Sequence, residues 1–161
     1  MSAVNTEEKR MDVKAWRVFL DSSVLISGVI SQAGASSAIL DLGEAGEIVI
    51  ILSKGILIET DRVFEKKFPE LIGSFREFIK NLSPIIAEEP TSQEIREAES
   101  VIDKDDASIL AAAKKENIHY LVSLDIKHFH TNQVREYFKS PIVTPARFLT
   151  EFRYIFEKGE N

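Results

Sequence analysis

The stretch RVFLDSSVLISGVIS, from Arg17 to Ser31, decides the fold. It opens with the apolar run Val18–Leu20, reaches Asp21, and continues without a break into apolar residues of helical character. A short apolar run of this kind is typical of a strand buried on both faces of a parallel sheet. Ligands of such sheets bind at the carboxyl ends of the strands. Asp21 therefore has two interpretations: an N-cap of the next helix, a position that Asp favours, or a residue of a binding site.

The same alternation of apolar runs and helical patterns continues along the chain. The predicted strands are Val18–Leu20, Ile48–Leu52, Pro84–Ala87, Tyr120–Leu124 and Pro141–Val143. After the helix that follows Asp21, helices are predicted at Ser36–Leu42 (ending at Gly43), Leu57–Phe68, Glu70–Asn81, Gln93–Ile102, Asp106–Glu116 and Phe148–Phe156. Strands that alternate with helices predict βαβ crossovers and an α/β layer fold.

Composition sets limits on function. The chain has 161 residues, 44% of them hydrophobic, which is enough for one domain with a sizeable core. The net charge of -6 argues against gripping duplex nucleic acid by bulk charge, although a local basic patch is compatible with it. There is no cysteine, which excludes disulfides and thiol chemistry and fits a reducing cytoplasm.

We expect residues 1–15 to form a disordered tail and residues 16–161 to form a single domain. The first fifteen residues are polar and of mixed charge, and they lack the apolar core of a signal peptide. No later apolar run has the length of a membrane span, so we expect no membrane association.

Further acids follow the other predicted strands. Asp125 comes just after a second apolar strand, Asp105 and Asp106 begin a helix of small residues, and Glu59 lies early in the helix after Gly55. Taken singly, each fits a helix cap, a surface acid or an ion pair. Together, carboxylates at one sheet edge repel and raise one another's pKa, which favours a bound cation. Carboxylate oxygens suit Mg²⁺ or Mn²⁺ rather than zinc.

Four segments in this order resemble the PIN domain (PilT N-terminus), the ribonuclease fold of many toxin-antitoxin toxins. They are VFLDSSVLISGVIS, ILIETDRVF, DDASILAAAKKENIHYLVSLDIKHF and IVTPARFL, and the similarity extends from about residue 17 to about residue 152. The resemblance implies a three-layer α/β/α sandwich with a central parallel sheet of about five strands. The acids of the family motif fall on Asp21, Glu59, Asp106 and Asp125. Ser23 stands where many members carry Asn, and His128 where many carry a further Asp.

The resemblance and the acids together predict a Mg²⁺- or Mn²⁺-dependent endoribonuclease that hydrolyses RNA with a metal-activated water. Asp21 and Asp106 are the expected central ligands, and Asp125 and Glu59 partial or water-mediated ones. We expect the stem of Glu59 to be buried, and Asp105 either to cap its helix or to tune the charge of the site. Serines at strand ends are either hydrogen-bond partners of the acids or local caps; these are Ser22, Ser23 and Ser123.

The substrate and partners are less constrained by the residues. Single-stranded or structured RNA is favoured, because a narrow acidic slot cannot wrap a duplex. Lys54, Lys127, His128 and His130 either contact phosphates or are solvated charges. The resemblance implies a cognate antitoxin and a homodimer, for which the apolar helices IGSFREFIKNL and ARFLTEFRYIF are candidate surfaces or ordinary core elements.

Other functions remain open at this point. A catalytically weak PIN-fold module that binds nucleic acid or protein is one alternative, and an RNA-processing nuclease without an antitoxin is another. A phosphatase-type α/β domain would carry a second acid two residues after Asp21, where this chain has Ser23.

Overall fold

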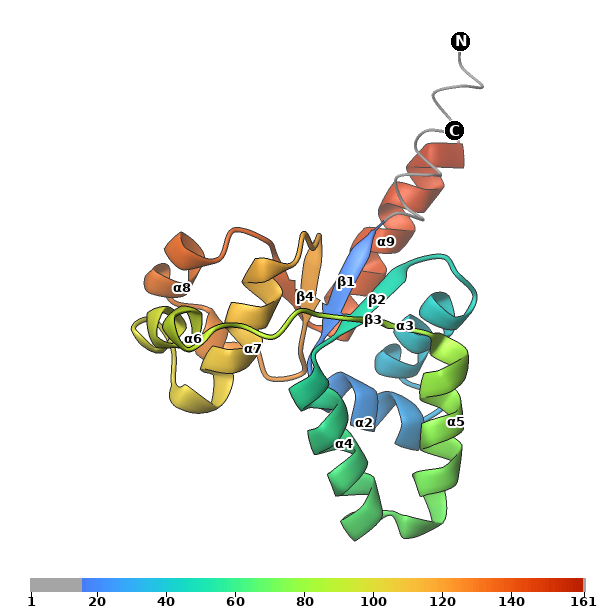
Figure 1. Ribbon diagram of the computed structural model, residues 1–161. Helices are drawn as coiled ribbons and strands as arrows, with labels where there is room; N and C mark the ends of the chain where they lie inside the picture. Colours follow the sequence, from blue (N-terminus) through green and yellow to red (C-terminus); the bar gives the residue numbers. More distant parts are fainter. Residues whose placement is uncertain (1–15, 161) are drawn as a thin grey trace.

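A computed structural model describes residues 16–160, and the predicted tail at residues 1–15 lies outside the described residues. Strands and helices alternate along the chain (Figure 1). The strands are β1 (Arg17–Leu20), β2 (Val49–Leu52), β3 (Ile85–Ile86), β4 (Tyr120–Val122) and β5 (Ile142–Val143). The α-helices are α2 (Ser22–Ile30), α3 (Ala35–Glu44), α4 (Lys54–Lys67), α5 (Ile72–Leu82), α6 (Ser92–Glu99), α7 (Lys104–Lys115), α8 (Asn132–Tyr137) and α9 (Pro145–Glu160). Two short 3₁₀ helices are η1 (Pro69–Leu71) and η2 (Lys127–Phe129).

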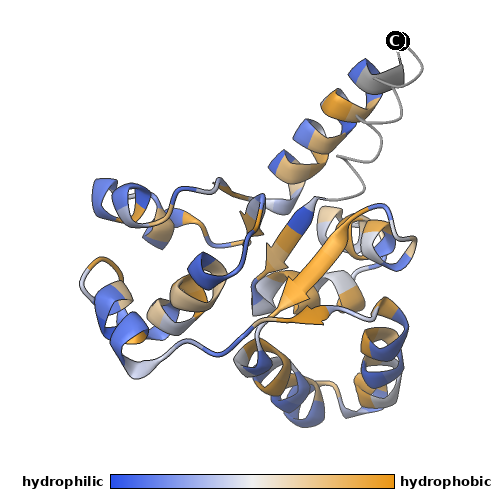
Figure 2. Ribbon diagram, turned by 45° about the horizontal axis from the view of Figure 1, so that its top comes forward, coloured by the Kyte–Doolittle hydropathy of each residue, from blue (hydrophilic) through white to orange (hydrophobic). Residues whose placement is uncertain are grey.

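The five strands form one parallel sheet in the order β3-β2-β1-β4-β5. β1 is central, and its residues Val18, Phe19 and Leu20 are fully buried. Figure 2 shows that the strands include the most hydrophobic segments of the chain. Strand order reverses at β1, since the chain leaves it toward β2 on one side and later returns to pair β4 on the other. The predicted parallel sheet of about five strands is therefore confirmed.

The helices separate into two packed groups. α2 packs against α3 and α4, and α3 also packs against α5 and α9, whereas α6 and α7 pack against each other (Figure 1). This arrangement confirms the three-layer α/β/α fold class. Within residues 16–160 no single helix is long and apolar enough to cross a membrane; α2 and α3 reach that length and composition only together, and they meet at 95°.

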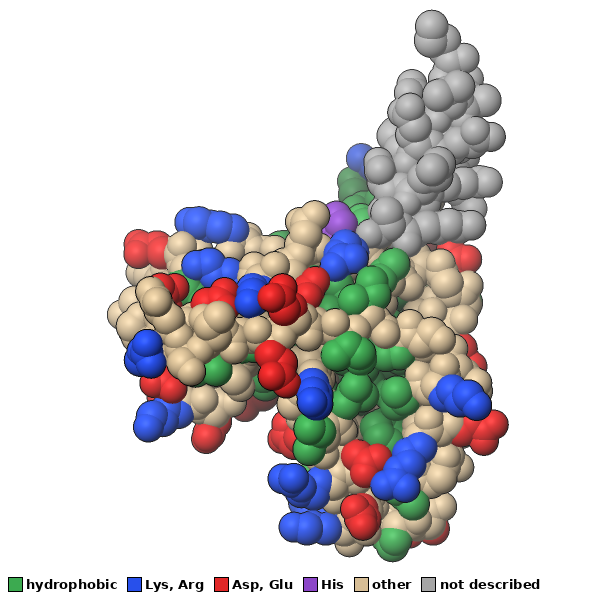
Figure 3. All heavy atoms as spheres, in the orientation of Figure 1, with side chains coloured by type: hydrophobic (Ala, Val, Ile, Leu, Met, Phe, Trp, Pro, Cys, Tyr) green, Lys and Arg blue, Asp and Glu red, His purple; other side chains and the backbone are tan. Residues whose placement is uncertain are grey.

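Several details of the predicted elements are wrong, among them the absence of α8 from the predicted helices and the end of α6 at Glu99 instead of Ile102. We expected every strand to be buried on both faces, but Ile85 and Ile86 of β3 are 40% and 49% exposed, because β3 is an edge strand. Hydrophobic side chains gather on this face between β3, α4 and α5 (Figure 3). The helix expected to end at Gly43 continues to Glu44, and a Cβ at Gly43 would lie 2.5 Å from Cγ1 of Ile50. The turn glycine is Gly46, with φ of +78°.

The register between β1 and β4 positions the candidate site. Leu20 pairs with Val122, so the next residues on these two strands are Asp21 and Ser123. The backbone N–H of Asp21 still donates to the carbonyl of Val122 at 3.1 Å. Two polar side chains are thus placed side by side where the sheet ends and its order reverses, the location at which open α/β sheets bind ligands.

Candidate active site

Asp21 is held by several hydrogen bonds at the end of β1. It is the N-cap of α2, and its Oδ1 accepts from the backbone N–H of Ser23 at 3.2 Å and from the hydroxyl of Ser22 at 3.1 Å. The hydroxyl of Ser123 donates to Oδ2 at 2.6 Å. The two interpretations of Asp21 are therefore compatible, because one oxygen caps the helix while the other lies toward β4.

Ser123 connects the ends of two strands. It is fully buried, and besides donating to Asp21 its Oγ accepts from the backbone N–H of Asp125 at 3.2 Å. Ser23 makes a similar connection, since its Oγ accepts from the backbone N–H of Leu124 at 3.2 Å. The hydroxyls of Ser22 and Ser123 therefore bond the Asp21 carboxylate as predicted, whereas the hydroxyl of Ser23 bonds the backbone of Leu124 instead.

Asp106 belongs to a different element from Asp21. It lies half-buried in the first turn of α7, whose N-cap is Asp103. Burial raises the pKa of the Asp106 carboxyl above its ordinary value, and the negative charges of Asp21, Asp103 and Asp105 raise it further, while His128 acts in the opposite direction. The pKa of Asp106 is thus raised by Asp21, which is distant in sequence, as well as by its sequence neighbours.

Asp125 and His128 form a pair beside these acids. Nε2 of His128 lies 3.6 Å from Oδ2 of Asp125, and both side chains are more than half exposed. His128 also acts on the pKa of Asp106, and its contact is with the Asp125 carboxylate. The position where many relatives carry an acid therefore holds an imidazole close to the acid group.

Glu59 and Asp105 differ from what the sequence indicated. Glu59 lies in α4, directly before the buried Thr60, but its side chain is exposed, so the expected burial of its stem is wrong. α4 packs on α2, the helix that Asp21 caps. Asp105 does not cap α7, because Asp103 occupies the N-cap position. It lies in the first turn, where the helix dipole favours a negative charge, and its charge raises the pKa of Asp106, which is the other role predicted for it.

The donor set suits a hard cation bound by few protein ligands. In residues 16–160 no three acids or histidines are grouped closely enough to hold a metal ion by themselves. Asp106 is half-buried and its carboxyl is affected by the charge of Asp21, whereas the side chains of Glu59 and Asp125 are exposed. Mg²⁺ keeps several waters and is commonly bound by one or two carboxylates, so the pair of Asp21 and Asp106 fits this ion.

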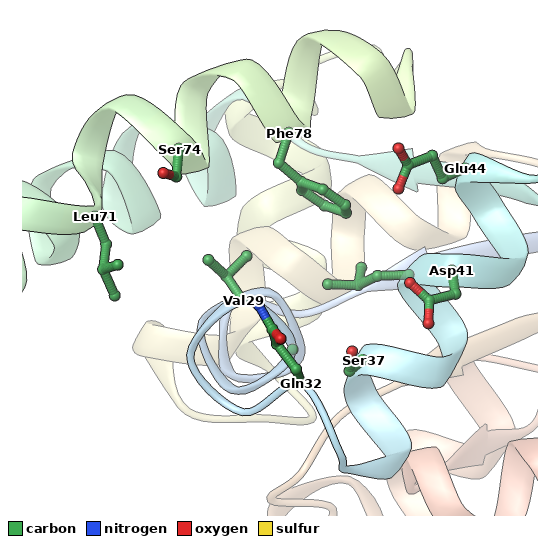
Figure 4. Close-up of a pocket in the computed structure, with 10 residues that line it drawn as sticks. Val29, Gln32, Ser37, Asp41, Glu44, Leu71, Ser74 and Phe78 are labelled. Carbon is green, nitrogen blue, oxygen red and sulfur yellow. The ribbon is translucent and has the colours of Figure 1, made fainter.

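One cavity is separate from the acids. It has a volume of about 490 Å³ and lies between α2, α3 and α5. Figure 4 shows Val29 and Phe78 directed into this space, with Asp41 and Glu44 on the α3 side. It is a groove lined by both apolar and polar side chains with an acidic edge, and none of the four predicted site acids lines it.

The fold and the acid pair define a class: an open parallel α/β protein with carboxylates at the reversal of strand order. The chain belongs to the PIN domain family, since the family's model matches residues 17–127. No curated protein sequence matches it significantly.

Two solved structures share the fold. The first is VapBC2 from Rickettsia felis, solved bound to a DNA fragment from its promoter; the TM-score is 0.59 and the identity 20%, over 79% of this chain and 96% of that chain. The second is PAE2754 from Pyrobaculum aerophilum, with a TM-score of 0.57 and 17% identity, over 88% of this chain and 98% of that chain. At these identities the likeness establishes the fold.

Proposed function

We propose that the chain is a Mg²⁺- or Mn²⁺-dependent endoribonuclease that cleaves single-stranded or structured RNA. Membership of the PIN domain family supports the reaction class, because PIN domains are generally nucleases. The observation that carries the proposal is that Asp21 ends the central strand β1 where the strand order reverses, that Ser123 holds its Oδ2 at 2.6 Å, and that the half-buried Asp106 of α7 is affected by the Asp21 charge. Such a pair is stabilised by a divalent cation.

Each site residue has a distinct part in this proposal. Asp21 and Asp106 hold the ion, which when bound supplies an activated water and neutralises charge on a phosphodiester. Ser123 keeps Asp21 oriented with its 2.6 Å hydrogen bond, and the N–H of Ser23 fixes the other oxygen. Asp125 and Glu59, which are exposed, act as partial or water-mediated ligands at the rim.

The charge distribution favours a single strand as substrate. The net charge of -6 gives little general attraction for a duplex backbone. Lys127, a cation, and His128, which offers a ring nitrogen, are exposed on η2 close in sequence to Asp125 and are well placed to meet a phosphate. One exposed strand passing the acid pair needs few such contacts.

We further propose that a cognate antitoxin controls the site. Support comes from the fold shared with VapBC2 of Rickettsia felis and from the groove edged by Asp41 and Glu44, which suits a helix with apolar and basic residues. An arginine of the partner would pair bidentately with Asp21 and Asp106. Because that arginine and Mg²⁺ would compete for the same carboxylates, we expect inhibition by the antitoxin to weaken as the Mg²⁺ concentration rises.

A homodimer and a cytoplasmic location complete the proposal. α9 exposes Tyr154, Ile155 and Phe156, while α5 uses Phe75 in the core, where its ring stacks on Phe64 at 4.6 Å. α9 is therefore the better of the two candidate surfaces for a second copy. The lack of cysteine is compatible with a reducing compartment.

One observation favours a different function. Because no three acids or histidines in the described residues are grouped as metal ligands, a catalytically weak PIN-fold binding module is the second candidate. Assaying purified protein on single-stranded RNA with Mg²⁺, Mn²⁺ or EDTA separates the two: the nuclease cleaves only with a divalent ion, and the binding module retains RNA uncut in all three. If the protein cleaves RNA, purifies without a partner protein and is inhibited by no protein of its host, an RNA-processing nuclease is favoured.

A further inference from the structure

A second cavity opens beside the acid pair. It has a volume of about 430 Å³, and its lining residues are Glu99, Val101, Ile102, Asp103, Lys127, His128 and Thr131. Asp103 is the N-cap of α7, three positions before Asp106, and His128 contacts Asp125 at 3.6 Å. The cavity therefore lies next to the turn of α7 that carries Asp106 and next to the partner of Asp125, although neither acid lines it.

The cavity is larger than a hydrated ion requires. Its volume falls in the range of roughly 300–1,000 Å³ that is usual for small-molecule sites. One wall comes from the connection between α6 and α7, and the other from η2 and the start of α8. Two separate segments thus enclose a space of the size that one nucleotide needs.

The lining side chains offer three kinds of contact. Ile102, 9% exposed, and the half-buried Val101 provide apolar surface. Lys127 provides a cation, and it forms no ion pair with any residue in the described part of the chain. Glu99 and Asp103 provide carboxylates, and Asp103, although an N-cap, makes no capping hydrogen bond with its side chain. A cation alone would use only the carboxylates.

We propose that this cavity binds the nucleotide next to the cleaved bond and prefers guanine, an inference that rests on the proposed ribonuclease function. The base would lie on Val101 and Ile102, and its phosphate would meet Lys127. Guanine presents two adjacent donors, N1–H and N2–H, which match the two oxygens of a carboxylate from Asp103 or Glu99. Uracil has a single N–H flanked by two carbonyl oxygens, and these would face the carboxylates with like partial charge.

Nucleotide binding tests the site without requiring cleavage. In an NMR titration of the full chain, guanosine 5′-monophosphate should bind about tenfold or more tightly than uridine 5′-monophosphate, with the largest amide shifts at Val101 and Ile102. Glu99→Gln and Asp103→Asn should each reduce that ratio, because a carboxamide keeps only one acceptor oxygen. Lys127→Ala should weaken both nucleotides alike, since both carry the phosphate.

Glu97→Gln is the matched control, because Glu97 is exposed on the same helix as Glu99 and does not line the cavity. It should leave the ratio unchanged. Equal affinity for the two nucleotides, shifts confined to another surface, or a ratio unaffected by both carboxylate variants would overturn the inference. If the protein cleaves no RNA yet binds guanosine 5′-monophosphate preferentially, the proposed function fails and the nucleotide site stands. If it cleaves RNA but binds both nucleotides equally, the proposed function stands and the nucleotide site fails.

Discussion

Replacing Ser123 with alanine should both destabilise the fold and slow cleavage. The buried Ser123 hydroxyl donates to a carboxylate oxygen of Asp21 at 2.6 Å. A hydrogen bond to a charged group contributes about 1.5–3 kcal/mol, so the free energy of unfolding should fall by that amount. For a domain of this size the melting temperature should fall by about 3–12 °C.

Activity should respond to the same change because Asp21 loses the contact that orients its second oxygen. A loss of about 1.4 kcal/mol of transition-state stabilisation corresponds to a tenfold lower rate, and we expect a decrease of at least that size. Thermal unfolding in EDTA measures the stability term, and RNA cleavage at saturating Mg²⁺ measures the rate. Separate measurements are needed because a fully folded variant can still cleave slowly.

Ser140→Ala provides a matched control. The Ser140 hydroxyl donates to the carbonyl of Ile118 at 2.9 Å, a neutral bond whose loss costs about 0.5–1.5 kcal/mol, and it does not contact the acids. In a double-mutant cycle of Ser123→Ala with Asp21→Ala, the loss of the Asp21 helix cap occurs both with and without Ser123 and therefore cancels. The coupling energy between the two residues should be about 1.5–3 kcal/mol. Additivity within about 0.5 kcal/mol, or an activity loss no greater than that of Ser140→Ala, would refute the reasoning.

Three further predictions concern the acids and the ion. Asp106→Asn should raise the free energy of unfolding at neutral pH in EDTA, because the pKa of Asp106 is raised in the folded state and its charged form is therefore destabilising. This advantage of the variant over the wild type should shrink as the pH falls through the raised pKa and wild-type Asp106 becomes protonated. Unfolding curves at several pH values measure it, and a stability difference that does not change with pH would contradict it. Mg²⁺ at about ten to a hundred times its dissociation constant should stabilise the wild type by about 1.4–2.7 kcal/mol and Asp21→Asn far less; a melting temperature that responds to zinc but not to Mg²⁺ or Mn²⁺ would count against oxygen ligands. Glu59→Gln and Asp125→Asn should lower the cleavage rate less than Asp21→Asn does, because the side chains of Glu59 and Asp125 are exposed. Cleavage rates at matched Mg²⁺ measure this, and a larger loss in either variant than in Asp21→Asn would show that the residue supplies a central ligand.

The fold could be predicted from the sequence because its signals are local. Val18–Leu20 is apolar and short, Asp21 follows it at once, and both features appear unchanged in β1 and the N-cap of α2. The exposure of β3 was not predictable in the same way, since Ile85 and Ile86 are as apolar as core residues. Only the strand order, which depends on the crossovers, makes β3 an edge.

The site could be predicted in part. The sequence indicates acids after strands, but the neighbours of each acid depend on strand register. The pairing of Leu20 with Val122 is what places Asp21 beside Ser123. The cap at Asp103 was missed because the run Asp103, Lys104, Asp105, Asp106 offers three caps with equal local signal. The cavity beside His128 joins two segments that are far apart in sequence, and no local pattern indicates it.

The most direct test of the central claim is cleavage of single-stranded RNA by the wild type, Asp21→Asn and Asp106→Asn at equal Mg²⁺, with each variant shown to be folded by its melting curve. Asparagine keeps the shape of the side chain and removes the charge that each acid contributes to the shared ion. The account predicts cleavage by the wild type that stops in EDTA and returns with Mg²⁺ or Mn²⁺, and losses of roughly a hundredfold or more in both folded variants, the size usual for removing one strong electrostatic contact to the transition state. Full activity in either variant, or wild-type cleavage that persists in EDTA, would contradict it.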